Sequence, residues 1–205
     1  MDPTLLAVSI ILLVFSVILH EVMHGLVALK FGDHTAENAG RLTLNPIPHI
    51  DLVGTILLPL ASILLHSGFL IGWAKPVPVN PLNFRDIRKG ELAVSLAGIG
   101  ANFALVIIFA ILYHLTYNLG NRFLTEIFVT GVGINLMLGV FNLIPIPPLD
   151  GSKVLISLLP YHLARQLESI GAYGFMILFL LIYLGILNLV VSLIIYPIIT
   201  LLGIR

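Results

Sequence analysis

Long apolar stretches alternate with short polar ones along the chain. Residues 4–29, 92–117 and 123–143 are each long enough to cross a bilayer, because a membrane-spanning helix needs about 20 apolar residues. Residues 52–71 are also apolar, but Pro59 and several glycines interrupt them. We interpret that stretch as a re-entrant or interfacial segment rather than a full crossing.

The last apolar stretch, residues 172–202, contains 31 residues. As a helix it measures about 46 Å, against a bilayer core of roughly 30 Å. It is either one tilted span or a helical pair broken near Gly185 and Asn188. In the loops we expect short β-like pieces at residues 41–44.

The pattern therefore predicts an all-α polytopic membrane protein, with a bundle of about 4–6 transmembrane helices and a re-entrant segment. We expect a single integral-membrane domain over residues 1–205, with its core at 4–155 and its C-terminal helices at 156–205. Composition agrees, since 59% of residues are hydrophobic, 10% are charged and the mean hydropathy is +1.09. A soluble domain of this length could not solvate so much apolar surface.

Three ionisable residues interrupt the first apolar stretch, in the pattern His20-Glu21-Val22-Met23-His24. On a helix, His20 and His24 lie on one face, one turn apart, which suits two imidazole ligands of a single Zn²⁺. Glu21 is rotated off that line, where it can deprotonate an attacking water. Ionisable groups at membrane depth are costly and indicate function. The alternative is that they pair with one another or with a distant carboxylate for packing alone.

A catalytic zinc site needs a third protein ligand, and the absence of cysteine leaves only His, Asp or Glu. Asp150 is the best candidate, because it follows a proline-broken apolar stretch, whereas most other acids lie in polar loops or at the ends of spans. We exclude the remaining histidines from the metal site. His34, His49 and His162 are expected to be solvated in loops, and His66 and His114 to be interfacial.

These ligands meet only if the first and third long spans run in the same direction. With residues 52–71 re-entrant, eight of the ten basic residues share one side, which the positive-inside rule makes cytoplasmic. We therefore expect a multi-pass protein of the cell membrane whose site opens toward the cytoplasm. The eight residues are Lys30, Arg41, Lys75, Arg85, Arg88, Lys89, Lys153 and Arg165.

With these motifs the chain resembles the site-2 protease family of intramembrane zinc metalloproteases. The match rests on residues 20–24, on Leu149-Asp150-Gly151 after a proline-rich break, and on Gly98-Ile99-Gly100-Ala101-Asn102. Residues 72–81, GWAKPVPVNP, are typical of small prokaryotic members, which lack an inserted PDZ domain. Family members commonly carry proline at the position of Ile99.

The resemblance implies that His20, His24 and Asp150 ligate one Zn²⁺ per chain and that Glu21 activates the water. It also implies that Gly98 and Asn102 lie near the site, with Asn102 touching the substrate or the oxyanion. Helix packing is the alternative for Gly98 and Asn102. Asn142 is either a helix-end cap or a substrate contact.

The expected substrates are single-span membrane proteins, hydrolysed within the lipid bilayer, and no nucleic-acid partner is expected. A helical substrate must unwind before attack, and either residues 41–44 or residues 75–81 could hold it extended by edge pairing. Two alternatives come from other classes: a membrane metal transporter, and a catalytically inactive binding homologue. The absence of an internal repeat argues against transport, and the intact motif argues against inactivity.

Overall fold

The computed structural model describes residues 3–57, 60–61, 64 and 73–204. In this part of the chain, four helical stretches are long and apolar enough to cross a membrane, and no residue forms a β-strand. The four stretches are α1 (Pro3–Lys30), α4 (Ile87–Asn118), α5 (Arg122–Leu143) and Tyr161–Tyr183. The all-α polytopic architecture expected from the sequence is confirmed.

Shorter elements connect the spans. Between α1 and α4 lie α2 (Thr35–Asn38), the 3₁₀ turn η1 (Ile47–His49), the π-helical turn η2 (Leu52–Leu57) and the 3₁₀ turn η3 (Pro81–Asn83). After α5 follow α6 (Asp150–Leu158), α7 (Tyr161–Ile170), η4 (Gly171–Tyr173), α8 (Gly174–Tyr183) and α9 (Ile186–Leu201).

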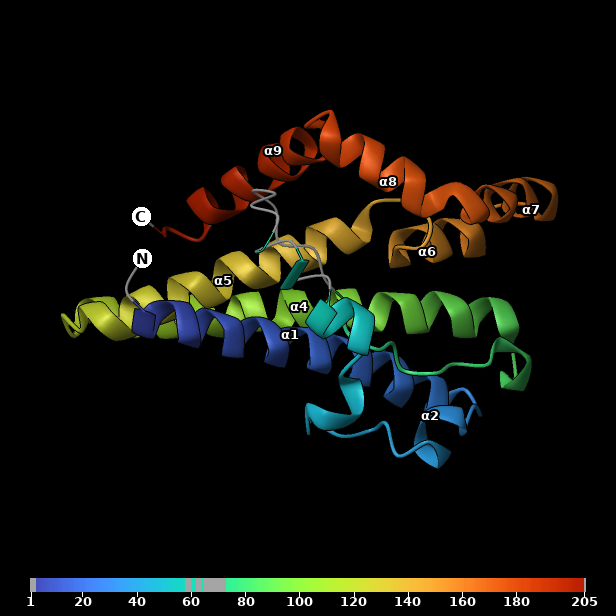
Figure 1. Ribbon diagram of the computed structural model, residues 1–205, viewed down its shortest axis with the longest axis horizontal. Coiled ribbons are helices and arrows are strands. Elements are labelled where there is room, and N and C mark those ends of the chain that lie inside the picture. The colour runs from blue at the N-terminus through green and yellow to red at the C-terminus, as the bar shows by residue number, and fades with distance from the viewer. Residues whose placement is uncertain (1–2, 58–59, 62–63, 65–72, 205) are drawn as a thin grey trace.

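Helices α1, α4 and α5 pack against one another and form the centre of the molecule. Figure 1 shows α1 and α5 running in the same direction and α4 running in the opposite one. The main apolar core lies between α4 and α5, where Phe109, Val132 and Leu136 are buried. The parallel arrangement of α1 and α5 is the one that the ligand positions required.

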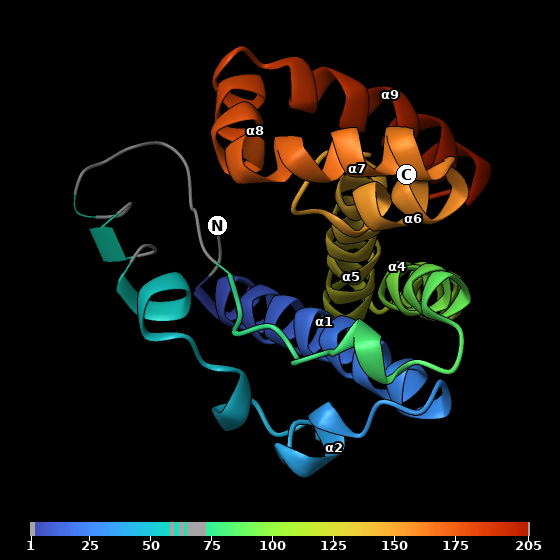
Figure 2. The same ribbon diagram turned by 90° about the vertical axis from the view of Figure 1, so that its right-hand side faces the viewer.

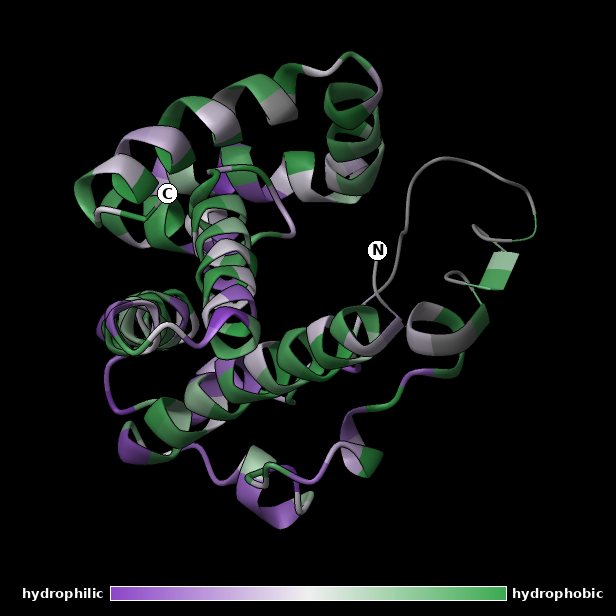
Figure 3. Ribbon diagram, turned by 90° about the vertical axis from the view of Figure 1, so that its left-hand side faces the viewer, coloured by the Kyte–Doolittle hydropathy of each residue, from purple (hydrophilic) through white to green (hydrophobic). Residues whose placement is uncertain are grey.

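The C-terminal helices lie on the side of α5 opposite α1 (Figures 1 and 2). Gly185 adopts a left-handed conformation, with φ of 72°, and separates α8 from α9. Residues 172–202 are therefore a helical pair broken at Gly185, the second of the two arrangements left open by the sequence. Figure 3 shows hydrophobic residues throughout α8 and α9, whereas hydrophilic residues gather around α2. Exposed apolar side chains of this kind suit a lipid-facing surface.

Two expectations about the loops need correction. Residues 41–44 form no strand, and the Arg41 N–H instead bonds to the carbonyl of Ala36 in α2. His49 is not solvated: it is 2% exposed, and its Nε2 lies 2.9 Å from the carbonyl oxygen of Thr43. Most of the expected re-entrant segment, residues 52–71, lies outside the described residues.

Buried polar side chains fasten an irregular segment, residues 75–81, across the end of α1. We call this segment the strap. At its start, the Arg41 guanidinium donates to the Lys75 carbonyl over 2.7 Å, and the Lys75 N–H donates to the His49 carbonyl over 2.9 Å. Near its end, the Asn80 N–H donates to Asp33 over 2.7 Å. The strap is therefore held at both ends by residues of the loop that follows α1.

Asp33 is the fully buried member of this set. Its carboxylate accepts hydrogen bonds from the N–H and hydroxyl of Thr35, from the Asn80 N–H and from the Asn83 side chain. Burial alone raises the pKa of the Asp33 carboxyl, but these hydrogen bonds hold the pKa below its ordinary value. The charged form is thus the one that stabilises the fold.

We expect Asp33→Asn to lower the free energy of unfolding by about 1–3 kcal/mol at pH 7, because an amide cannot accept the same set of donors. The folded-state pKa is lowered, so the stabilisation is present above about pH 4 and is lost as the pH falls through that pKa. Thermal melts in detergent from pH 7 to 3 should therefore show the gap between wild type and variant narrowing on acidification. Exposed Glu37 provides the control, since Glu37→Gln should change stability by less than about 0.5 kcal/mol. A stability difference between wild type and Asp33→Asn that does not change with pH would contradict the role of the Asp33 charge.

Candidate metal centre

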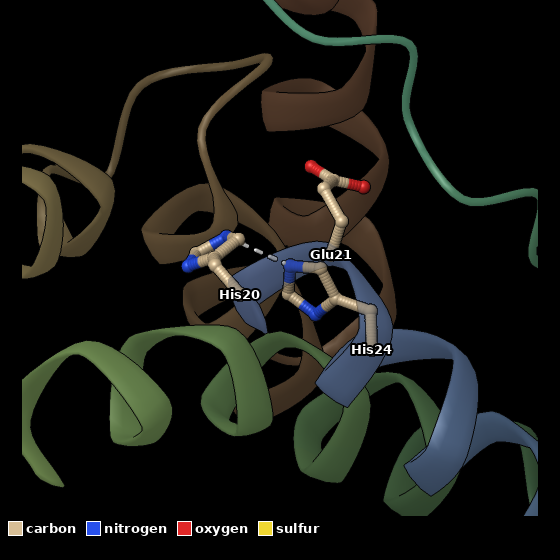
Figure 4. A group of neighbouring side chains, drawn as sticks. All are labelled: His20, Glu21 and His24. Atoms are coloured by element: carbon tan, nitrogen blue, oxygen red, sulfur yellow. Dashed lines mark hydrogen bonds between the residues drawn. The ribbon is translucent and has the colours of Figure 1, made fainter. Parts of the chain in front are cut away.

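His20 and His24 project from α1 as adjacent side chains on one face (Figure 4). Their Nε2 atoms lie 3.0 Å apart, and the residues are 7% and 8% exposed. Helix geometry explains the pairing, because residues four apart are stacked one turn above the other. Gly98 of α4 lies against both imidazoles. A Cβ atom at Gly98 would come within 2.5 Å of His24 Cε1 and 2.7 Å of His20 Cε1, so only glycine lets α4 approach α1 this closely.

Asp150 reaches the two imidazoles from a different part of the chain. Helix α5 ends at Leu143, and the prolines that follow deny a helical continuation until α6 begins at Asp150. Asp150 Oδ2 lies 3.1 Å from the Nε2 atoms of both His20 and His24. Gly151 permits this turn, because a Cβ there would lie 2.2 Å from the Leu143 carbonyl oxygen. The structure thus brings together the three ligands expected from the sequence.

A chain of buried amides determines which nitrogen of His20 carries a proton. The Asn135 side-chain NH₂ donates to the Gly131 carbonyl over 2.9 Å, so its oxygen must face Asn102. That oxygen accepts from the Asn102 NH₂ over 3.0 Å, which turns the Asn102 oxygen toward His20 Nδ1 at 2.7 Å. His20 Nδ1 is therefore the donor, and its Nε2 carries a lone pair.

His24 is oriented in the same way by the backbone of α4. Its Nδ1 lies 2.7 Å from the carbonyl oxygen of Val94, which can only accept. In the neutral imidazole, Nε2 of His24 therefore also carries a lone pair. Such outer hydrogen bonds are what usually hold histidine ligands of a metal in the correct tautomer.

With both imidazoles neutral, three acceptor atoms converge with no proton between them. The two Nε2 atoms and Asp150 Oδ2 form a triangle with sides of 3.0, 3.1 and 3.1 Å. Asp150 Oδ2 is buried and makes no hydrogen bond. Atoms of this kind repel one another unless a cation lies among them, and tetrahedral Zn²⁺ ligands at ~2.0–2.1 Å would be about 3.3–3.4 Å apart. The donor set fits a zinc ion with a fourth position left open.

Glu21 stands beside this triangle without joining it. Its carboxylate turns away from α4 (Figure 4), and its Oε2 accepts a hydrogen bond of 2.8 Å from the N–H of Val77 in the strap. Glu21 also lines the cavity that contains the two histidines and Asp150. A carboxylate in this place can exchange a proton with a water or a substrate in the cavity.

The cavity has a volume of about 300 Å³ and is bounded by α1, the strap, α4, the end of α5 and α6. Asn142, which the sequence linked either to a helix cap or to substrate, lines it, while its NH₂ donates to the Leu138 carbonyl over 3.0 Å. Asn102 is fully buried and is not among the lining residues, and its observed partners are His20 and Asn135. The lining residues are His20, Glu21, His24, Pro76, Val77, Val79, Pro81, Phe84, Glu91, Val94, Ser95, Asn142, Pro148, Asp150 and Lys153.

Several residues of the site escaped the sequence analysis. Asn135 carried one usable signal, since a polar side chain in the middle of an apolar span marks an interhelical contact. The Val94 carbonyl had no such signal in the sequence, because every residue has a backbone carbonyl. The strap's contact with Glu21 was equally invisible, since it joins positions 56 residues apart.

Comparison with known proteins agrees with this geometry. The model of peptidase family M50 matches residues 117–186. The chain is 38% identical to "Putative zinc metalloprotease YwhC" of Bacillus subtilis, over 87% of this chain and 81% of the relative. It is 32% identical to "Putative zinc metalloprotease Rip2" of Mycolicibacterium smegmatis, over 84% and 65%. It is 27% identical to "Zinc metalloprotease MJ0392" of Methanocaldococcus jannaschii, over 93% and 48%. No solved structure matches the chain.

We expect Asn102→Ala to weaken zinc binding by about 10- to 100-fold, because the His20 ring loses the partner that fixes its tautomer. Competition with a chelator of known affinity would measure this. Asn142→Ala is the matched control, since Asn142 lines the same cavity without touching a histidine, and it should leave zinc affinity unchanged. Equal affinities for wild type and Asn102→Ala would refute the orienting role.

Proposed function

This chain belongs to peptidase family M50, the site-2 protease family of zinc metalloproteases, and we propose that it cleaves single-span membrane proteins within the bilayer. The observation that supports this best is the triangle of three buried acceptor atoms beside the Glu21 carboxylate in one cavity. In the proposal, His20, His24 and Asp150 hold the zinc ion. When bound, Zn²⁺ supplies Lewis acidity, which lowers the pKa of water and polarises a peptide carbonyl.

Glu21 is the general base in this proposal. Its carboxylate takes a proton from water as the water oxygen bonds to the peptide carbon, and it returns that proton to the amine nitrogen as the C–N bond breaks. The contact with Val77 supports the assignment, because it fixes the carboxylate at the edge of the cavity rather than among the ligands. Burial of the site in a helical bundle limits access of bulk water to the reacting groups.

The proposed orientation places the site toward the cytoplasm. The C-terminal end of α1 and the start of α4, which both carry basic residues, lie at the same end of the bundle as α6 (Figure 1). The positive-inside rule assigns that end to the cytoplasmic face. The proposed substrates would therefore present their scissile bonds below that face.

The strap is the element that we propose to hold the unwound substrate. Four of its residues line the cavity, namely Pro76, Val77, Val79 and Pro81. The other segment considered from sequence, residues 41–44, is absent from the lining, and Leu42 packs against Gly25 of α1. An irregular backbone beside the site offers main-chain groups to an extended peptide.

The deciding experiment compares wild type with Glu21→Gln on a model single-span substrate in liposomes, with zinc content assayed in both. Both should hold about one zinc ion. The variant should cut at least ~10³-fold more slowly, because it lacks the base while keeping the ligands. Equal cleavage would refute the role of Glu21, and absence of zinc from both would refute the ligand assignment. If both hold zinc and neither cuts, zinc flux into vesicles would test the transporter alternative.

Cross-linking would test the strap, and the natural absence of cysteine makes single-cysteine variants unambiguous. In the Glu21→Gln background, Val79→Cys should form a disulfide with a cysteine near the scissile bond of the substrate. Leu44→Cys is the control, because it is exposed on the competing segment and should cross-link much less. Preferential cross-linking at position 44 would instead assign substrate binding to residues 41–44.

A further inference from the structure

The face of α4 that meets α1 carries one polar group with no partner. The Val94 carbonyl accepts from His24, and the Asn102 oxygen accepts from His20. Ser95 lies on the same face, one turn before Gly98, and lines the cavity. It is 1% exposed, and its hydroxyl is buried without a hydrogen bond.

Most other helical hydroxyl groups in the described part of the chain bond to a backbone carbonyl three or four residues earlier. A helical Ser or Thr ordinarily bonds to the carbonyl four residues earlier. Ser157 follows that rule, with its Oγ 2.8 Å from the Lys153 carbonyl oxygen. The same arrangement holds for Ser9, Thr116, Thr125, Thr130 and Thr200. Ser95 makes no such bond, although its hydroxyl is buried.

A buried hydroxyl left unpaired is unfavourable, so its partner is expected to be a group that enters the cavity. The polar atoms of the site that face the cavity from the ligand side are acceptors, namely the two imidazole nitrogens and the Asp150 carboxylate. Of the other side-chain donors in the lining, half-buried Asn142 uses one of its two N–H groups on the Leu138 carbonyl, and Lys153 is exposed. Ser95 is the buried donor.

Its position is also distinct from that of Glu21. Glu21 faces the strap and points away from α4, whereas Ser95 belongs to α4 (Figure 4). A base and a hydrogen-bond donor on different walls can act on different oxygens: the base on the attacking water, and the donor on the carbonyl oxygen of the substrate.

We propose that the Ser95 hydroxyl donates a hydrogen bond to the carbonyl oxygen of the scissile peptide as that oxygen gains negative charge. The assignment rests on the proposed protease function and adds a catalytic residue to it. Water adds to the carbonyl carbon, its proton passes to Glu21, and the former C=O electron pair becomes the oxyanion that Ser95 contacts. No proton leaves Ser95. When the C–N bond breaks, the carbonyl re-forms and the amine takes the proton from Glu21.

The test compares Ser95→Ala, Ser95→Thr and Ser157→Ala with wild type. Three quantities are measured: kcat and KM on a single-span substrate, bound zinc, and affinity for a phosphinic peptide. The phosphinic group mimics the tetrahedral oxyanion and gives a readout independent of turnover. Ser157→Ala is the matched control, because it removes a buried helical hydroxyl outside the cavity lining.

Ser95→Ala should lower kcat by about 100-fold, with KM within about twofold and zinc retained, as expected for loss of an oxyanion donor. Affinity for the phosphinic peptide should fall by a similar factor. Ser95→Thr keeps the hydroxyl and should recover most of both, while Ser157→Ala should match wild type.

Unchanged kcat and phosphinic affinity in Ser95→Ala would overturn the proposal. Loss of zinc in Ser95→Ala, with no recovery in Ser95→Thr, would also overturn it, since Ser95 would then be structural. Failure of wild type to cut any substrate would count against the proposed protease function instead. In that case the phosphinic affinities of wild type and Ser95→Ala still decide the role of Ser95.

Discussion

Three lone pairs held at one point inside an apolar helical bundle are the constraint on which the rest of this structure depends. Two imidazole nitrogens and one carboxylate oxygen lie 3.0 to 3.1 Å apart, and with both imidazoles neutral no proton separates them. Hydrogen bonds from Nδ1 of each histidine to fixed acceptors ensure that the lone pairs, rather than the N–H groups, face inward. Such an arrangement is unfavourable by itself and favourable around a cation, so its geometry suits a metal ion.

The arrangement of the central helices brings these three acceptor atoms together. His20 and His24 come from α1, whereas Asp150 arrives only after two further helices, so α1 and α5 must run in parallel with α4 antiparallel between them. Close contact of α4 with α1 then requires glycine at position 98. Asn102 of α4 accepts a hydrogen bond from His20 of α1 and donates one to Asn135 of α5. All three central helices therefore take part in orienting the His20 imidazole.

The sequence was sufficient to predict what depends on local spacing. The i, i+4 relation of His20 and His24 follows from helix geometry, and the proline break before Asp150 follows from backbone chemistry. It was insufficient wherever a contact joins distant residues through a loop. His49 looked like a solvated loop residue because its neighbours are polar, yet backbone groups brought in by folding surround it. The expected strand at residues 41–44 failed for a related reason: packing of Leu42 onto Gly25 outweighs local β propensity.

The strap connects the loop that follows α1 to the candidate metal site. Two of its positions contact residues of the loop after α1, through Arg41 at one end and Asp33 at the other, and between them Val77 donates its N–H to Glu21. The carboxylate proposed as the base is therefore positioned by a segment whose own position depends on a buried aspartate outside the spans. Because residues 76 and 78 are prolines and have no N–H, few backbone donors of the strap can compete for Glu21. A peptide paired with the strap would therefore lie beside the backbone N–H that contacts Glu21.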